Sequence, residues 1–198
     1  MYIALKRFNE LSKESAVSRK YKIHDSGMPH FVSFAIVNWI DLFTRKEFAN
    51  IITDSLSYCI QKKGLILNAW CIMPNHVHLI IRSERNSLSD ILRDLKKFTS
   101  YRLYGAIQEH PQESRKEWML WMFERSGSLN PNNKNFQIWQ QHNQPIELDT
   151  KDKVDQRLEY LHMNPVKAGF VAGPEDWMHS SARQYAGLEK RFDLELVE

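Results

Sequence analysis

LILNAWCIMPNHVHLIIRS, residues 65–83, is the stretch that decides the fold, because two strand-like runs meet within it at a short turn. Residues 65–73 and 76–83 are rich in β-branched and other apolar side chains, and only Pro74 and Asn75 separate them. A connection this short joins antiparallel neighbours. We therefore predict a β-hairpin at the centre of the fold.

The segment before the hairpin predicts a strand and then a helix. Residues 30–38 (HFVSFAIVN) combine β-branched and aromatic side chains, as strands do. Thr44 and Glu47 resemble a capping box, which marks the start of a helix. Helical spacing then continues as far as Gly64, a residue type that commonly ends helices, through Phe48, Ile51, Ile52, Ser55 and Cys59.

The segment after the hairpin predicts a long helix that begins at Ser87 and runs past Tyr104. Its buried stripe is predicted to hold Leu88, Ile91, Leu92, Leu95 and Phe98. The remaining elements are expected in this order: a short helix at 118–123, a surface loop at 127–135, a fourth strand at 136–141, and a helix from about 149 to 163 that Pro165 ends.

The predicted order of elements is β, α, β, β, α, β, α, which is that of a ferredoxin-like, split βαβ antiparallel sheet with an added C-terminal helix. At 198 residues, with 42% hydrophobic and 12% aromatic side chains, the chain is long and apolar enough for one α+β domain. We assign this domain to residues 30–187, with an N-terminal extension at 1–29 and a C-terminal tail at 188–198.

Bulk charge does not identify a partner. The chain has 27 Lys and Arg against 24 Asp and Glu, so a nucleic-acid surface would have to come from local clustering. Cys59 and Cys71 are too few for a disulfide framework, and no apolar stretch is long enough to span a membrane. We expect a cytoplasmic protein without membrane contact, associated with the nucleoid if it binds DNA.

Two histidines in the second strand of the hairpin are candidate metal ligands. Because side chains alternate along a strand, His76 and His78 project to one face, and the apolar set Val77, Leu79 and Ile81 projects to the other. The apolar set is expected to meet the helices, which leaves the histidines on the open face of the sheet. The spacing alone is a weak indication of a metal site, because ordinary surface or hydrogen-bonded imidazoles show it more often.

The C-terminal helix carries a phenol and an amide on one side. Tyr160 and Asn164 are four residues apart, so they share a helical face. The apolar positions Val154, Leu158 and Leu161 cluster elsewhere round the helix, which leaves Tyr160 free to reach into a cleft. Pro165 disfavours helical geometry at Asn164, and by spacing alone the tyrosine is as well explained by packing and the asparagine by a helix stop.

The runs AWCIMPNHVHLIIRS (69–83) and EYLHMNPVKAGFV (159–171) together resemble the REP-associated tyrosine transposases, which are relatives of the IS two-hundred type single-tyrosine transposases in the HUH nuclease superfamily. The resemblance covers about residues 30–187, with no matching motif at 105–135. The family's positions are occupied by Pro74, His76, Val77, His78, Tyr160, Asn164 and Gly169. A later element also looks like the family's Trp-Ser-Ser-Tyr, although Met178 and His179 interrupt it here: Trp177, Ser180, Ser181 and Tyr185.

This resemblance implies a metal-dependent nuclease that nicks and rejoins single-stranded DNA near hairpins. Tyr160 would attack the phosphodiester and form a covalent 5′-phosphotyrosine. His76, His78 and the Asn164 amide oxygen would hold a divalent ion, Mg²⁺ or Mn²⁺, although imidazoles also accept Zn²⁺, Ni²⁺ or Co²⁺. The enzyme could act as a monomer or a homodimer, so the tyrosine could serve its own histidines or a partner's.

A DNA surface needs cations and stacking groups. The candidate phosphate contacts are Lys96, Lys97, Arg102, Lys167 and Arg183, although solvated charges on helix faces are the usual alternative. Trp70 shares the strand parity of Asn68 and could stack a base on the open face, or pack in the core. Two other functions stay open: a non-catalytic binder of single-stranded nucleic acid, and a small metallohydrolase, which the lack of a nearby acidic ligand disfavours.

Overall fold

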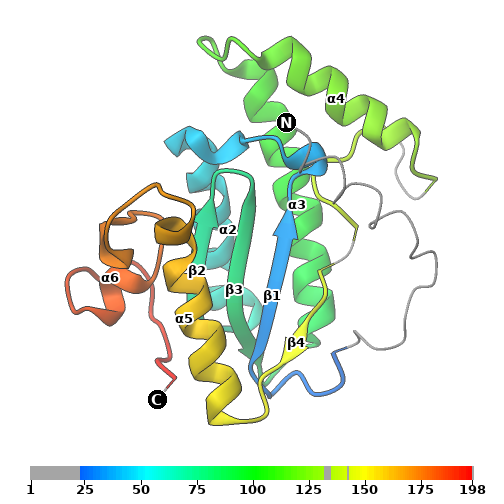
Figure 1. Ribbon diagram of the computed structural model, residues 1–198. Coiled ribbons are helices and arrows are strands. Elements are labelled where there is room, and N and C mark those ends of the chain that lie inside the picture. The colour runs from blue at the N-terminus through cyan, green and yellow to red at the C-terminus, as the bar shows by residue number, and fades with distance from the viewer. Residues whose placement is uncertain (1–22, 132–134, 142, 198) are drawn as a thin grey trace, which may run out of the picture.

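A four-stranded antiparallel sheet forms the centre of the computed structural model, which describes residues 23–131, 135–141 and 143–197 (Figure 1). Most of the expected N-terminal extension therefore lies outside the described residues. The strand order β2-β3-β1-β4 confirms the ferredoxin-like α+β prediction. The strands are β1 (His30–Ala35), β2 (Leu65–Met73), β3 (His76–Ser83) and β4 (Ile146–Glu147).

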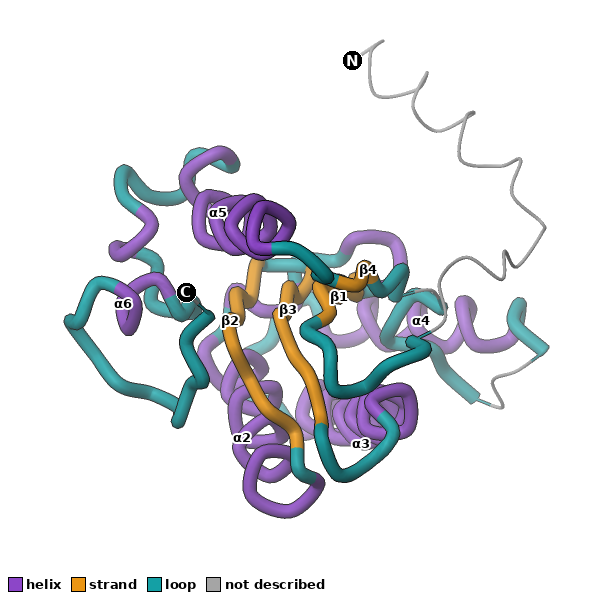
Figure 2. The backbone as a smooth tube through the Cα atoms, turned by 90° about the horizontal axis from the view of Figure 1, so that it is seen from below, coloured by secondary structure: helices purple, strands orange, loops and turns teal. Residues whose placement is uncertain are grey.

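Helices cover both faces of the sheet. Figure 2 shows α2 (Lys46–Lys63) and α3 (Leu88–Glu109) on one face and α5 (Lys151–Lys167) on the other. The face expected to be open is therefore covered by α5, and this expectation was wrong. Among the described residues no helix has both the length and the apolar character needed to cross a membrane. The other elements are α4 (Lys116–Ser128), α6 (Ala182–Tyr185) and the 3₁₀ helices η3 (Val37–Trp39), η4 (Leu42–Thr44) and η5 (Pro174–Asp176).

The sheet separates two hydrophobic clusters. The larger cluster contains Val77, Leu79 and Ile81, which pack against α2 and α3 as their strand parity predicts. The smaller cluster lies under α5 and contains the strand residues Phe31, Ala69, Cys71, Met73 and Ile80 together with Leu148, Val154 and Leu161. The smaller cluster packs α5 against the same sheet face that carries His78.

A β-bulge at Asn68 overturns the prediction for Trp70. The pairing of β2 with β3 skips one residue between Leu67 and Ala69, so side chains beyond the bulge point to the opposite face from the one simple alternation predicts. Trp70 is consequently only 1% exposed and packs in the larger cluster, with its ring against Phe192. It is a core residue and cannot stack a base.

The predicted fourth strand at 136–141 was also wrong. This segment follows the edge of β1, but within it only Trp139 forms a bridge, to Ile36. Gln144 then takes a positive φ of 40°, which an extended strand does not tolerate. Pairing resumes at β4, where Ile146 lies opposite Phe31.

The hairpin bounds are as predicted, whereas several helix details differ. Thr44 does not cap α2, because it ends η4 and its hydroxyl donates to the Asp41 carbonyl oxygen. Ser87 caps α3 as expected, but Phe98 is 55% exposed, so it lies outside the buried stripe. The helix predicted at 118–123 extends to Ser128.

Gly127 therefore lies in the last turn of a helix and does not begin the predicted surface loop at 127–135. It is buried, and a Cβ there would lie 2.5 Å from Cα of Phe136. Because no real Cβ comes that close to a backbone atom, only glycine lets the end of α4 pack on the following chain. Residues 132–134 of the predicted loop lie outside the described part.

Pro165 does not end the C-terminal helix, contrary to prediction. It lies in the last turn of α5, where the missing N–H removes a single helical hydrogen bond. The Asn164 carbonyl still accepts from the Ala168 N–H at 3.0 Å, so Asn164 keeps its helical position. Gly169 follows with a φ of 77° and the helix ends.

The Trp-Ser-Ser-Tyr element lies along the outer edge of β2. The Trp177 ring nitrogen donates to the Ile72 carbonyl oxygen, and the Tyr185 hydroxyl donates to the Asn68 carbonyl oxygen. The Ser181 hydroxyl accepts from the Trp70 N–H at 3.0 Å. The element therefore satisfies backbone groups that an uncovered edge strand would leave open.

Candidate active site

Four side chains that are far apart in the sequence meet between the sheet and α5. His76 and His78 lie side by side on β3, with ring centroids 4.6 Å apart. The ring of Tyr160 lies 5.4 Å from the ring of His78, and the amide nitrogen of Asn164 lies 3.2 Å from His78 Nε2. The structure thus brings together the tyrosine, the asparagine and the histidine pair of a single chain.

Burial keeps both histidines neutral. Burial lowers the pKa of His76 to about 4, and burial together with the neighbouring His76 lowers the pKa of His78 to about 3. A neutral imidazole has one ring nitrogen with a free lone pair, which is the form that binds metal. Both rings are therefore in the ligand form at neutral pH.

A hydrogen-bonded chain orients the His76 ring. Nδ1 of His76 lies 2.7 Å from Oδ1 of Asn75, and Nδ2 of Asn75 donates to Oδ1 of Asp41 at 2.8 Å. An amide oxygen only accepts, so Nδ1 of His76 carries the proton and Nε2 keeps the lone pair. Asn75 and Asp41 were missed in the sequence, although the position of Asn75 next to His76 in the turn is a usable signal.

The donor set fits a divalent ion. Nδ1 of His78 is buried without a hydrogen-bond partner among the described residues, and the Asn164 amide faces the other ring nitrogen. When the amide turns over, its oxygen takes the place of its nitrogen beside that ring. In the described part of the chain, no group of three or more His, Cys, Asp or Glu could hold a metal instead. Two imidazoles and one amide oxygen are the ligands that this site offers.

Phe31 and Arg157 surround the tyrosine and were not found from the sequence. Phe31 stacks on His78 with centroids 5.4 Å apart and meets Tyr160 edge-on at 5.9 Å. The Arg157 guanidinium lies 5.4 Å from the Phe31 ring centre and 6.0 Å from the Tyr160 ring centre. Arg157 precedes Tyr160 by three residues, so helical spacing is the signal that could have placed it there. Tyr160 itself is 38% exposed.

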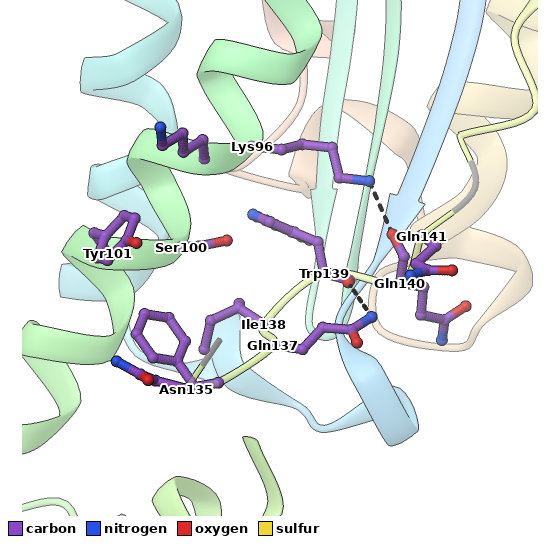
Figure 3. A pocket seen from close by; sticks show the side chains of 11 residues that line it. Lys96, Ser100, Tyr101, Asn135, Gln137, Ile138, Trp139, Gln140 and Gln141 are labelled. Carbon is purple, nitrogen blue, oxygen red and sulfur yellow. Dashed lines mark hydrogen bonds between the residues drawn. The ribbon is translucent and has the colours of Figure 1, made fainter. Parts of the chain in front are cut away.

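Lys96 is held inside the molecule. Figure 3 shows its ammonium group bonded to the Gln140 carbonyl oxygen, and it also donates to Oδ1 of Asn143 at 2.6 Å. Burial lowers the pKa of Lys96 to about 8. Its visible contacts therefore fasten the segment beside β1 to α3, and its DNA contact stays a prediction.

The other predicted phosphate contacts are spread over the surface. Lys97 and Arg102 are exposed on α3, across the sheet from the histidines, and Arg102 lies over the Phe98 ring. Arg183 on α6 is bonded to Glu189 and to the Glu175 carbonyl oxygen. Only Lys167 shares α5 with Tyr160, at a spacing of seven residues that places both on one side of the helix.

Sequence comparison matches the chain to a known family. A family model described as "Transposase IS200 like" matches residues 28–126, which is half of the chain and includes both histidines but not Tyr160. A curated Haemophilus influenzae protein assigned to the REP-associated tyrosine transposases is 28% identical over 117 residues, or 57% of this chain. The match spans 56% of that relative's length.

Structural comparison identifies the same fold in a solved relative. The structure of a REP-associated tyrosine transposase bound to a REP hairpin matches with a TM-score of 0.63 and 17% identity. It covers 92% of this chain and 94% of that one, so the likeness in fold extends over nearly the whole chain. A Deinococcus radiodurans protein assigned as a transposase matches with a TM-score of 0.44, too low to add to the argument.

Proposed function

The chain belongs to the IS200-like transposase family, and from this premise we propose that it is a metal-dependent endonuclease and strand transferase acting on single-stranded DNA. We propose that it cuts near hairpins and forms a 5′-phosphotyrosine at Tyr160. One observation carries the proposal: the hydroxyl-bearing Tyr160 on α5 lies beside His78, which pairs on β3 with a second neutral imidazole, that of His76. Nothing in core packing requires that combination.

His76, His78 and Asn164 would hold the ion, for which we propose Mg²⁺ or Mn²⁺. A bound divalent cation polarises the phosphate and offsets the negative charge that develops during attack. The chain's own contribution is to keep the ligand nitrogens unprotonated and oriented. Burial of His78 and the hydrogen bond from His76 to Asn75 do this.

Tyr160 would supply the nucleophile. Its oxygen bonds to phosphorus, the bond from phosphorus to the 3′ oxygen breaks, and the departing 3′ oxygen takes up a proton as the phenol loses one. The phosphotyrosine is itself a phosphodiester, so the energy of the broken DNA bond is kept. A 3′-hydroxyl, of the same strand or of another, can therefore attack the phosphorus, release the tyrosine and join the DNA. The partial exposure of Tyr160 supports access by a DNA strand.

Arg157 would add a positive charge next to the reacting phosphate. Its guanidinium lies over Phe31 and beside the Tyr160 ring, and no carboxylate of the described residues pairs with it. An unpaired guanidinium can bond two phosphate oxygens. We therefore include Arg157 among the residues that contact substrate, together with Lys167 at the end of the same helix.

Hairpin DNA with single-stranded flanks is the proposed substrate. The solved relative was bound to a REP hairpin, and that likeness in fold supports a similar ligand here. Tyr160 contacts His78 of its own chain, which supports action without exchange of the tyrosine helix between subunits. A non-catalytic single-strand binder is the rival function, and it predicts binding that is indifferent to metal.

The decisive experiment is trapping of a covalent adduct. Wild-type protein is incubated with hairpin DNA labelled at its 3′ end and Mn²⁺, and the product is resolved on a denaturing gel. We expect a labelled protein band that is lost in Tyr160→Phe and after metal chelation. The band should be kept in Tyr58→Phe, because Tyr58 is an exposed residue of α2, on the opposite face of the sheet from the site. An adduct that persists in Tyr160→Phe would refute the assignment of the nucleophile. DNA binding with no adduct in the wild type would favour the rival function.

A further inference from the structure

Trp39 is an exposed aromatic residue on a strained backbone. It follows β1 at the end of η3, its side chain is 57% exposed, and its φ is 55°. The preceding Asn38 also has a positive φ, of 56°. Bulky residues rarely take this left-handed conformation, and such outliers cluster at functional sites. Because most of the indole is in solvent, burial of the side chain does not account for the strain.

The surrounding hydrogen bonds hold this conformation. The Trp39 N–H donates to the Ile36 carbonyl oxygen at 3.0 Å, and the Trp39 carbonyl oxygen accepts from Nδ2 of Asn75. Asn75 is the same residue that accepts from His76. The backbone that carries the indole is therefore held by the network that orients a candidate metal ligand.

The indole lies next to the histidine pair. Its ring centroid is 5.8 Å from that of His76, with the two planes at 77°. His76 in turn contacts His78, and His78 contacts Tyr160. Trp39 thus extends the row of rings from the tyrosine past both imidazoles and out to the surface.

We propose that Trp39 is a stacking platform for one unpaired nucleobase adjacent to the scissile phosphate. Every base has a flat face, so an exposed indole accepts any of them, and single-strand binding proteins use aromatic side chains in this way. The indole contacts His76, a ligand of the proposed metal that would bind the phosphate. It is therefore within reach of a base of the bound strand. The ligand is taken to be a DNA strand, because this inference rests on the proposed function. The backbone strain is the cost of presenting the ring at this point.

The other exposed tryptophans lack this setting. Trp118 and Trp121 are about half exposed on α4, and Arg125 lies over the Trp121 ring at 5.2 Å. Neither has a ring contact with a histidine in the described part of the chain. Trp118 is therefore a matched control for an exposed indole outside the site.

The test separates stacking from phosphate binding. Binding of fluorescein-labelled (dT)₁₂ and of a twelve-residue abasic strand is measured by fluorescence anisotropy in the presence of Ca²⁺. We expect Trp39→Gly to weaken binding of (dT)₁₂ by roughly five-fold or more and to leave the abasic strand nearly unaffected, because one lost stack costs at least that much. Trp118→Ala should match the wild type on both strands, and Trp39→Phe should keep most of the affinity.

Glycine takes a positive φ freely, so Trp39→Gly should melt at the wild-type temperature or above it. Lower affinity without lower stability is a result that a purely structural residue would not give. If Trp39→Gly does not fold, the comparison of Trp39→Phe with Trp39→Leu decides, because only the phenyl ring stacks.

Three outcomes would overturn the platform: wild-type affinity for (dT)₁₂ in a folded Trp39→Gly protein, an equal loss on both strands, or no single-strand binding by the wild type. Failure of the proposed function looks different. In that case Trp39→Gly weakens binding of (dT)₁₂ as expected, but the wild type forms no Tyr160 adduct with hairpin DNA. Conversely, adduct formation by the wild type together with unchanged affinity of Trp39→Gly for (dT)₁₂ would support the nuclease function and refute the stacking role of Trp39.

Discussion

The side-chain amide of Asn164 lies 3.2 Å from Nε2 of His78, although the two residues are 86 positions apart in the chain. The contact exists because α5 crosses the sheet face from which His78 projects, and because the helix continues through Pro165. An amide and an imidazole that face one point form two thirds of the proposed ligand set.

Asn164→Ala should weaken divalent metal binding. Removal of the amide leaves two imidazoles as protein ligands, and we expect the dissociation constant for Mn²⁺ to rise by about tenfold or more, as measured by titration calorimetry. Asn164→Asp should bind Mn²⁺ at least as tightly as the wild type, because a carboxylate oxygen adds charge. Gln156→Ala, at an exposed position of α5, is the control. Equal affinities in Asn164→Ala and Gln156→Ala would remove Asn164 from the metal site.

Asn75→Ala should reduce metal affinity without removing a ligand. Asn75 accepts from Nδ1 of His76, and loss of such an outer partner typically costs 10–100-fold in metal affinity. A double-mutant cycle with His76→Ala checks the cause. We expect Asn75→Ala to have little further effect once His76 is gone. Additive losses in the cycle would show that Asn75 acts elsewhere.

Arg157→Ala should slow formation of the covalent adduct by roughly 10²–10³, the usual effect of removing one charge-stabilising donor. Single-turnover kinetics at saturating DNA measure this, and the affinity for Mn²⁺ should not change. Arg157→Lys should restore part of the rate, because a lysine keeps the charge but loses the paired contact. Arg93→Ala removes an exposed arginine on α3 and serves as the control. A wild-type rate in Arg157→Ala would contradict a contact with the reacting phosphate.

The sequence was sufficient for the hairpin and for the face of β3 that packs against the helices. Alternation placed Val77, Leu79 and Ile81 against the helices, and the short turn at Pro74 and Asn75 fixed the register of β2 and β3. These features are local, so a pattern within about twenty residues contains them.

The errors came from departures from regular strand pairing and from the exact ends of helices. One extra residue at Asn68 reverses the parity that was used to place Trp70 on the open face. The segment 136–141 has strand-forming residues, but within it only Trp139 forms a bridge, to Ile36. Pro165 was tolerated because it lies in the last helical turn. None of these outcomes follows from residue type alone.

The residues that support the candidate site were the hardest to identify from the sequence. Asp41 acts through Asn75, and Trp39 is placed by two left-handed residues that no motif marks. Arg157 looks like an ordinary solvated helix charge until the sheet places Phe31 beneath it. The family motif names the proposed reactive groups, whereas the tertiary fold selects the groups that would orient them.

Glu113, which lies away from the candidate site, should make the stability of the protein fall in acid. Its side chain is 1% exposed and lies between Arg45 and Arg115, which joins the start of α2 to the start of α4. Hydrogen bonds from the Arg115 side chain are the largest cause that lowers the pKa of Glu113 to about 2. The folded state therefore binds the Glu113 proton more weakly than the unfolded state does. The resulting stabilisation is complete above about pH 4.5, the usual glutamate range, and is lost as the pH falls toward 2.

Glu113→Gln keeps the shape of the side chain and cannot ionise, so it should melt below the wild type at pH 7 by on the order of 5 °C. Thermal melts followed by circular dichroism from pH 7 down to pH 3 should show this gap narrowing below about pH 4.5, because the wild type loses the stabilisation that the variant never had. Glu117→Gln makes the same charge change at an exposed position of α4 and should track the wild type at every pH. A gap between Glu113→Gln and the wild type that stays constant with pH would mean that packing, and not the ionised carboxylate between the two arginines, is the source of the stability.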